Sequence, residues 1–290
     1  MDEASAIEDS EKIARNLKLI LAYDGSEFSG WQVQPGRATI QGTLASAIGR
    51  LTGENVLPQG SGRTDAGVHA FAQVATFQTA ASIPTENWIK ALNDILPASI
   101  RVLQVNDVPL EFHARKSALA KTYRYRMYRG AICPPFIARY AWHYPFPLDE
   151  LLMAQAASLV VGEHDFTSFA AADAERAERM AAGESQNQDQ NQNPNHKGHR
   201  GSQGQSENQI TNIRTIFSSE WSREGDDLVY TVRGRGFLHH MVRNLVGTFL
   251  LVGKGTLSGD DFRAILHAGN RSAAGPTAPA SGLYLVGVEY

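Results

Sequence analysis

The chain has 290 residues, 42% of them hydrophobic and 20% charged, so its composition is that of a globular protein with one large domain or two modest ones. No apolar run reaches the roughly 20 residues of a membrane helix, and the acidic N-terminus lacks a signal-peptide core, so neither a membrane protein nor a secreted one is expected. The single cysteine, Cys133, cannot form an internal disulfide, and we therefore expect a cytoplasmic protein.

The net charge of −3 is not that of a typical nucleic-acid-binding protein, but the charges are unevenly distributed. Residues 112–148 contain no acid, seven Lys or Arg residues and nine of the 25 aromatic residues. Residues 228–259 also lack acids and carry four basic residues: Arg233, Arg235, Arg243 and Lys254. Such stretches suit phosphate binding and base stacking. Composition alone slightly favours another interpretation, two solvated charged faces beside buried tyrosines.

In chain order, the first half is predicted to alternate strands and helices. Apolar periodicity predicts a strand over 16–23, a helix over 39–51, a strand over 74–79, a helix over 85–96, and strands over 101–108 and 121–129. Thr85 is expected to cap the second helix, which ends before Pro97.

The second half has the same mixed character. The predicted elements are a helix over 148–161, strands over 213–221 and 228–232, helices over 237–252 and 258–267, and a strand over 283–289. Ser258 and Asp261 form a capping-box pattern at the last helix. Two α+β units that can share one sheet are therefore expected.

The expected domain limits follow from composition and from prolines. Pro145 and Pro147 interrupt regular structure, so we expect an N-terminal domain over 16–146 and a C-terminal domain over 147–290. Residues 1–15 are expected to be a disordered extension. Residues 183–209 contain twelve Gln or Asn and no aliphatic or aromatic residue, so this insert is also expected to be disordered.

The most informative segment is Gly60 to Ala70, in which three glycines surround a lone carboxylate, Asp65, two residues after Arg63. Glycines permit tight turns and close backbone approach to a ligand, so this acid is expected in an exposed turn. A short Gly-Arg-Thr-Asp motif alone would favour a surface hairpin with an Arg–Asp pair. Here the pattern continues through Ala66-Gly67-Val68-His69.

Residues 62–69, Gly-Arg-Thr-Asp-Ala-Gly-Val-His, resemble the catalytic loop of the tRNA pseudouridine synthase A family. Further segments resemble that family in the same order: 23–25 with 30–32, 40–41, 112–115, 123–125, 162–169, 237–244 and 282–285. Since these segments span nearly the whole chain, chance agreement is implausible. The chain departs from the family at the Gln/Asn-rich insert, where the family normally has a short tRNA-contacting segment, and at the acidic N-terminal extension, which has no evident role.

The resemblance implies an α+β fold of two α/β domains with a joined, mainly antiparallel central sheet flanked by helices and loops, the pseudouridine synthase fold. It implies a homodimer that acts on tRNA and forms pseudouridine in the anticodon stem-loop, at positions 38, 39 and 40. It also implies that no cofactor is used.

The resemblance further assigns roles to individual residues. Asp65 would attack the sugar or remove a proton, and the sequence does not choose between these routes. Arg243 would be its cationic partner, Tyr123 would stack on uracil and assist proton transfer, and Arg63 would help displace the flipped base. The implied RNA-contacting residues are Phe112, His113, Ala114, Arg115 and Lys116. Without the resemblance, Arg63 would form a simple ion pair with a nearby acid, Arg243 would be a surface arginine on a helix, and Tyr123 would be a core residue on a strand.

Four histidines, His69, His113, His239 and His240, raise the question of a metal. His239 and His240 are adjacent on a predicted helix, so they should point about 100° apart and not share an ion. No Cys pair or His-Glu-x-x-His spacing indicates zinc, so we predict no metal site.

Three alternatives remain open. An N-glycosidase would also use a carboxylate and a flipped base but would release uracil. A non-catalytic RNA-binding or tRNA-folding protein would explain the basic aromatic stretches but gives Asp65 no role. A metabolic enzyme could use Arg63 and Arg243 as anion clamps, but the chain lacks a glycine-rich phosphate loop between strand and helix.

Overall fold

The computed structural model describes residues 14–171 and 211–290. The insert predicted over 183–209 lies outside the described residues, as does the predicted extension up to residue 13. Arg15, which was assigned to that extension, begins the first strand and pairs with Thr79. Within the described ranges, no helix is long and apolar enough to cross a membrane.

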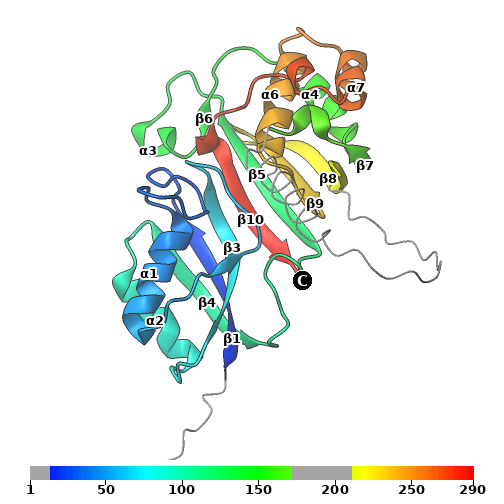
Figure 1. Cartoon of the computed structure of the whole chain (residues 1–290). Coiled ribbons are helices and arrows are strands. Elements are labelled where there is room, and N and C mark those ends of the chain that lie inside the picture. Colours follow the sequence, from blue (N-terminus) through cyan, green and yellow to red (C-terminus); the bar gives the residue numbers. More distant parts are fainter. Residues whose placement is uncertain (1–13, 172–210) are drawn as a thin grey trace, which may run out of the picture.

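One sheet of ten strands runs through the described part of the chain (Figure 1). Its strand order is β4-β1-β3-β10-β5-β9-β8-β7, with β2 beside β3 and β6 beside β5. The strands are β1 (Arg15–Tyr23), β2 (Gln59–Gly60), β3 (His69–Thr79), β4 (Ile100–Val108), β5 (Ala120–Tyr128), β6 (Trp142–His143), β7 (Gly162–Asp165), β8 (Ile213–Glu224), β9 (Asp227–Gly234) and β10 (Leu283–Glu289).

The last strand, β10, joins the two halves of the chain. It lies between β3, to which it is parallel, and β5, to which it is antiparallel. On its other side β5 pairs with β9 of the second half. All other pairings except that of β5 with β6 are antiparallel. The predicted fold class, a joined and mainly antiparallel sheet with flanking helices, is therefore confirmed.

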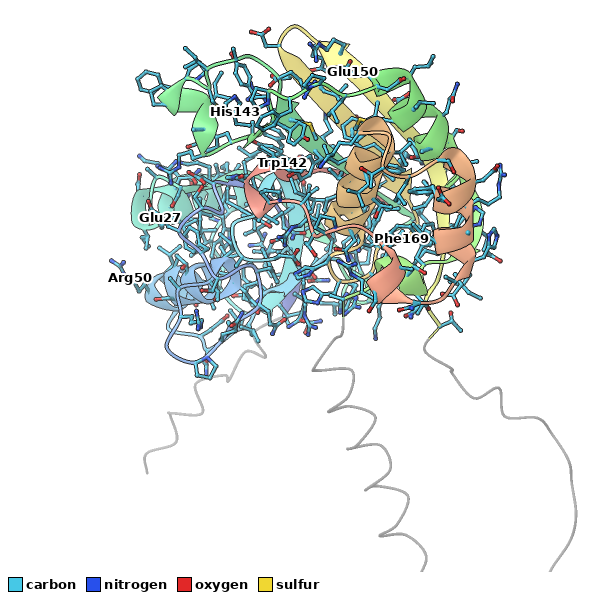
Figure 2. All side chains as sticks on the ribbon, turned by 90° about the horizontal axis from the view of Figure 1, so that it is seen from above. Glu27, Arg50, Trp142, His143, Glu150 and Phe169 are labelled. Carbon is cyan, nitrogen blue, oxygen red and sulfur yellow. The ribbon has the colours of Figure 1, made fainter. Side chains whose placement is uncertain are left out.

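Apart from the short helix α3, the helices form two groups, one for each half of the sheet (Figure 1). They are α1 (Ile40–Thr52), α2 (Thr85–Ile95), α3 (Pro135–Ala138), α4 (Glu150–Ser158), α6 (Met241–Gly253) and α7 (Gly259–His267). Helices α1 and α2 lie beside β1, β3 and β4, whereas α4, α6 and α7 lie beside β8 and β9. Figure 2 shows Arg50 at the outer edge of α1 and Phe169 near α6 and α7, in the interior of the second half.

Helix boundaries follow the predictions in part. The capping box of α7 is present, since Ser258 and Asp261 bind each other's backbone amides. Thr85 as a cap was wrong: Pro84 occupies the cap position of α2 and makes no side-chain bond. The helix predicted over 237–252 begins only at Met241, because His240 adopts a left-handed backbone with φ 59°. His240 is the one non-glycine residue with positive φ in the described ranges.

Helix α6 packs unusually closely against the segment 275–278. A Cβ added at Gly247 would lie 1.7 Å from the carbonyl oxygen of Pro276, so only glycine fits there. The contact matters for the site, because the backbone of Ala278 in the same segment binds Arg243 of α6 through the Ala278 N–H to Arg243 O bond of 3.1 Å.

We predict that Gly247→Ala lowers the free energy of unfolding by about 1–3 kcal/mol, because the added methyl forces α6 away from Pro276. In an unobstructed helix the same change would raise stability by up to about 1 kcal/mol. Gly259→Ala at the start of α7 is the control, since a Cβ there meets no atom within 4 Å. The stability of both variants is measured by urea unfolding. Equal midpoints for Gly247→Ala and Gly259→Ala would contradict this packing.

Candidate active site

Asp65 lies in the loop between β2 and β3, and hydrogen bonds fix the backbone on both sides of it. The Trp31 amide donates to the carbonyl of Thr64 at 3.0 Å, and the hydroxyls of Tyr23 and Thr64 lie 2.9 Å apart. Gly30, with φ 84°, is required here, because a Cβ would lie 2.5 Å from the Thr64 carbonyl oxygen. The Asp65 backbone is thus held against the loop that follows β1.

The start of this loop is tied to β3 and β5 by buried polar groups. The Ser61 hydroxyl donates to Gln73 Oε1 at 2.6 Å, and Gln73 Nε2 donates to the Gly62 carbonyl at 2.9 Å. From β5, Lys121 Nζ donates to the Ser61 carbonyl at 2.6 Å. Because unpaired polar groups are costly to bury, this network favours one loop conformation.

Asp65 of the first half is in contact with Arg243 of α6, which lies in the second half. Arg243 Nη1 donates to Asp65 Oδ2 at 2.8 Å, and the two side chains are 14% and 17% exposed, respectively. A second bond, from Arg243 Nε to the Ala278 carbonyl at 2.7 Å, fixes the guanidinium. The pair is therefore shielded from solvent and orientated from both ends.

His239 and His240 also approach the Asp65 carboxylate. Their Nε2 atoms lie 3.4 Å from Oδ1 and from Oδ2, respectively, and their ring centroids lie 4.0 Å apart. Burial lowers the pKa of His240, an effect that the negative charge of Asp65 opposes.

The geometric argument against a metal at these histidines was therefore wrong. It placed both on a helix, whereas α6 begins after them and the left-handed His240 turns their rings toward the same carboxylate. The three residues offer ligand atoms that all lie within 4.8 Å of one another, so this group could hold a metal ion. The Arg243 cation on the same carboxylate opposes a divalent ion.

The carboxylate faces a cavity of about 780 Å³, which Arg63, Tyr123 and Arg115 also line. Tyr123 is buried, with its ring edge-on to Phe237 at 5.0 Å. Burial, and then the charges of Tyr23 and Asp65, raise the pKa of Tyr123 well above its usual range. Its hydroxyl is therefore protonated at neutral pH and can donate a hydrogen bond. Arg63 is exposed, and its Nε donates to Gln32 Oε1 at 3.1 Å.

The predicted RNA-contacting segment 112–116 is split by the structure, and only Arg115 among its residues lines the cavity. Phe112 packs against Tyr290 with ring centroids 4.9 Å apart. His113 accepts hydrogen bonds from the Arg115 and Lys116 amides, and so shapes the turn. The side chain of Ala114 is buried and has no surface to offer a ligand.

The acid-free stretch 112–148 is less basic in three dimensions than in sequence. Four of its seven cations form ion pairs with acids from elsewhere in the fold: Arg124 with Glu224, Arg126 with Asp227, Arg129 with Glu150, and Arg139 with both Asp24 and Glu27. The other three, Arg115, Lys116 and Lys121, have no acid partner among the described residues. Within the described residues, only three of the seven cations of this stretch therefore remain unneutralised.

Four residues that line the cavity have no predicted role in the reaction: Lys121, Arg214, His239 and His240. Lys121 lies two positions before Tyr123 on β5, and side chains two apart point to the same face of a strand. That spacing could have identified Lys121. Arg214 reaches the cavity from β8 through the sheet topology, so no local pattern indicates it.

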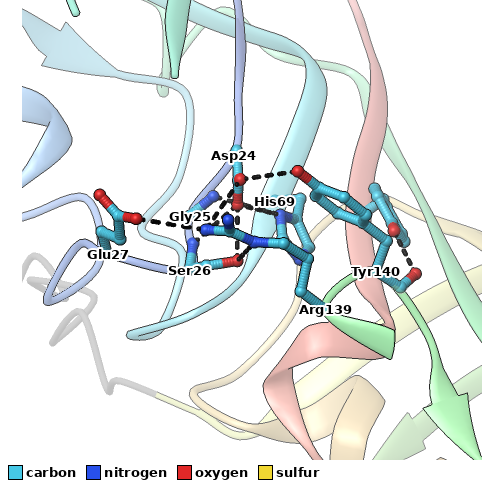
Figure 3. Close-up of polar contacts among 8 residues, drawn as sticks. Asp24, Gly25, Ser26, Glu27, His69, Arg139 and Tyr140 are labelled. Atoms are coloured by element: carbon cyan, nitrogen blue, oxygen red, sulfur yellow. Dashed lines mark hydrogen bonds and ion pairs between the residues drawn. The ribbon is translucent and has the colours of Figure 1, made fainter. Parts of the chain in front are cut away.

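A second polar cluster holds the end of the loop that carries Asp65 (Figure 3). Asp24 Oδ2 accepts a hydrogen bond from the Tyr140 hydroxyl at 3.0 Å and lies 3.3 Å from Arg139 Nη2. His69, the first residue of β3, accepts from the Gly25 amide at 3.2 Å through Nδ1, which also lies 3.2 Å from Asp24 Oδ1. The cluster fixes the chain four residues after Asp65.

Known proteins resemble this chain over almost its whole length. A family described as tRNA pseudouridine synthase matches residues 19–115 and 196–290. A protein of Solibacter usitatus named tRNA pseudouridine synthase A is 47% identical over 276 residues, which is 95% of this chain and 100% of the relative. Proteins with the same name from Moorella thermoacetica and Brevibacillus brevis are 43% and 41% identical, over 94% and 95% of this chain and 99% and 100% of theirs.

The buried His69 makes the free energy of unfolding depend on pH. Burial lowers the pKa of His69, which outweighs the opposing charge of Asp24, so the folded chain keeps it neutral. The unfolded chain takes up a proton below about pH 6.5 and then binds more protons than the folded one. The free energy of unfolding therefore decreases as the pH falls from 7 to 5, by at most about 1.4 kcal/mol per pH unit from this residue.

We predict a shallower decrease for His69→Asn, which keeps an acceptor for the Gly25 amide but has no proton to gain in this range. Urea unfolding at pH 5, 6 and 7 measures the slope. The control is His267→Asn, at the exposed end of α7, which should keep the wild-type slope. Equal slopes for wild type and His69→Asn would contradict the prediction.

Proposed function

Because the chain belongs to the tRNA pseudouridine synthase family, and is thus an isomerase that converts uridine to pseudouridine in tRNA, we propose that it modifies the anticodon stem-loop at positions 38, 39 and 40. Asp65 is the residue that we assign to the reaction. The observation that carries this assignment is the contact between Asp65 and Arg243 at the wall of a cavity shared by the two halves. The family resemblance also supports a cytoplasmic homodimer.

The reaction exchanges one glycosidic bond for another without redox chemistry. The bond between N1 of uracil and C1′ of ribose breaks, the base turns, and C5 bonds to C1′. C5 loses its hydrogen as a proton, and N1 gains one. An ionised carboxylate can start this sequence by attack on the sugar or by removal of a sugar proton.

The geometry divides the work between the two oxygens of Asp65. Arg243 binds Oδ2 and is itself anchored to the Ala278 carbonyl, so we assign Oδ1 to the ribose. The guanidinium stabilises the ionised carboxylate without occupying this second oxygen. Because the ion pair is largely shielded from solvent, its orientation is set before substrate arrives.

The uridine must leave its base stack to reach this carboxylate, which costs a few kcal/mol. Tyr123 lines the same cavity, and we assign it to stacking on the flipped uracil. Its raised pKa suits a hydroxyl that donates a hydrogen bond rather than a phenolate that removes a proton. Arg63 is exposed beside the cavity, and we assign it to the space that the flipped base leaves.

We predict that Asp65→Asn lowers the rate of tritium release from tRNA labelled at C5 of uridine by at least about 10³-fold, since the amide can neither attack the sugar nor accept its proton. Binding of tRNA should change less than about threefold, because phosphate contacts come from other residues. Asp260→Asn is the control, since Asp260 is exposed on α7 and pairs only with Arg263 among the described residues.

Equal tritium release by wild type and Asp65→Asn would remove Asp65 from the mechanism. Binding of tRNA by wild type without tritium release would favour the RNA-binding alternative. Release of free uracil from the labelled tRNA would instead identify a glycosidase.

A further inference from the structure

Lys121 places a cation at the cavity wall, and no residue in the described part of the chain supplies a matching anion. Its ammonium group has three N–H donors, and the Ser61 carbonyl at 2.6 Å is its one hydrogen-bond partner among the described residues. No carboxylate in the described ranges forms an ion pair with it, although the side chain is partly buried. A partly buried charge without a counter-ion is costly, so this arrangement suits an anion from outside the protein.

Two further cations reach the same cavity wall from different elements. Arg115 lies in the turn before β5, and Arg214 lies on β8 with its Nη1 bound to the carbonyls of Thr211 and Ile213. Burial first, and then the charges of Arg115 and Arg214, lower the pKa of Lys121 to about 8. Both arginines are therefore close enough for their charges to repel that of Lys121, and an anion beside Lys121 would reduce that repulsion.

The described residues that line the cavity carry almost no opposing charge. Asp65 is the one acid among the described residues that line it, and Arg243 already pairs with this carboxylate. The other charged or titratable groups of the lining are Arg37, Arg63, His239, His240 and Tyr123, none of which is an anion at neutral pH in this setting. Lys121 and Arg115, which have no acid partner among the described residues, therefore give this part of the wall a positive charge.

We propose that Lys121, Arg115 and Arg214 form a subsite for a backbone phosphodiester that flanks the flipped uridine. The proposal rests on the proposed function, since a flipped nucleotide brings its own two phosphates to the mouth of the cavity. Three cations from two halves of the chain can surround a phosphate, whose oxygens accept several charge-assisted hydrogen bonds.

The subsite also connects substrate binding to the loop that carries Asp65. Lys121 binds the Ser61 carbonyl, and its Nζ would lie 3.1 Å from a Cβ added at Gly62, so the ammonium packs directly on that loop. A purely structural lysine at this place would need only the bond to Ser61. The other two N–H donors of Lys121 would then have no partner among the described residues.

The test combines one change in the protein with one in the RNA. The RNA is a full-length tRNA in which an uncharged methylphosphonate replaces the phosphate on the 5′ or the 3′ side of the target uridine. The protein changes are Lys121→Met and the control Lys116→Met, an exposed basic residue outside the cavity lining. Equilibrium dissociation constants are measured for each protein variant with each RNA. All proteins carry Asp65→Asn, which prevents turnover.

We expect Lys121→Met to weaken binding of unmodified tRNA by about tenfold, the size of one charged hydrogen bond. The methylphosphonate on one side of the target uridine should weaken binding by a similar factor. When Lys121→Met is combined with that methylphosphonate, the tRNA should bind no more weakly than with either change alone. Lys121→Arg should restore binding, because it restores the charge. With Lys116→Met, the two losses should multiply.

The subsite would be overturned if the loss of affinity from Lys121→Met multiplied with the loss from the methylphosphonate at both the 5′ and the 3′ positions. If Lys121→Met does not fold, Arg115→Gln takes its place in the same cycle, since Arg115 is exposed. Multiplying losses at both positions for Arg115→Gln would overturn the proposal equally. Tritium release by wild type distinguishes the two levels: if it occurs while the losses multiply, only the subsite fails, and if it does not occur, the proposed function fails first.

Discussion

The ion pair between Asp65 and Arg243 is the constraint that the rest of the site depends on. Its two residues lie 178 positions apart in the chain, yet their atoms are 2.8 Å apart. Both side chains are largely shielded from water, so the loss of either partner would leave a poorly solvated charge, which is costly. The fold must therefore hold the two halves in one fixed relation.

Two features of the fold provide that relation. Strand β10 lies between β3 and β5, so the end of the chain runs beside the strand that follows the Asp65 loop. Close packing of Gly247 against Pro276 holds α6 to the segment whose Ala278 carbonyl binds Arg243. The backbone bonds to Thr64 and the Asp24–His69 cluster fix the other partner. The carboxylate is thus orientated before substrate binds, which is how a protein lowers the cost of reorganisation during a reaction.

Much of the fold could be predicted because local patterns determine it. The strand over 283–289 is a short, mostly apolar run, and Ser258 with Asp261 is a complete capping signal; both have the predicted bounds or contacts. The helix predicted over 237–252 starts four residues before the observed helix, because Phe237 and Leu238 continue its apolar pattern. The left-handed backbone of His240 has no signal in that pattern. This one error produced the wrong geometry for the two histidines.

The site was predictable only where a motif or a spacing carried it. Asp65, Arg63, Tyr123 and Arg243 were assigned by family resemblance, and the structure places all four at or beside one cavity. Arg214 required the strand order, and the unneutralised state of Lys121 required knowledge of which neighbouring arginines pair with acids. Such pairings connect distant parts of the chain, so composition alone gives the wrong count of available cations.

The most direct measurement of the central claim is a crystal structure of the protein with a tRNA that carries 5-fluorouridine at the target position, since a fluorine at C5 cannot leave as a proton. We expect a nucleotide outside its base stack, with the ribose C1′ within about 3.5 Å of Asp65 Oδ1, the ring against Tyr123, and Arg243 still on Oδ2. A target base that remains stacked, or that binds away from this carboxylate, would show that Asp65 does not act on the flipped nucleotide.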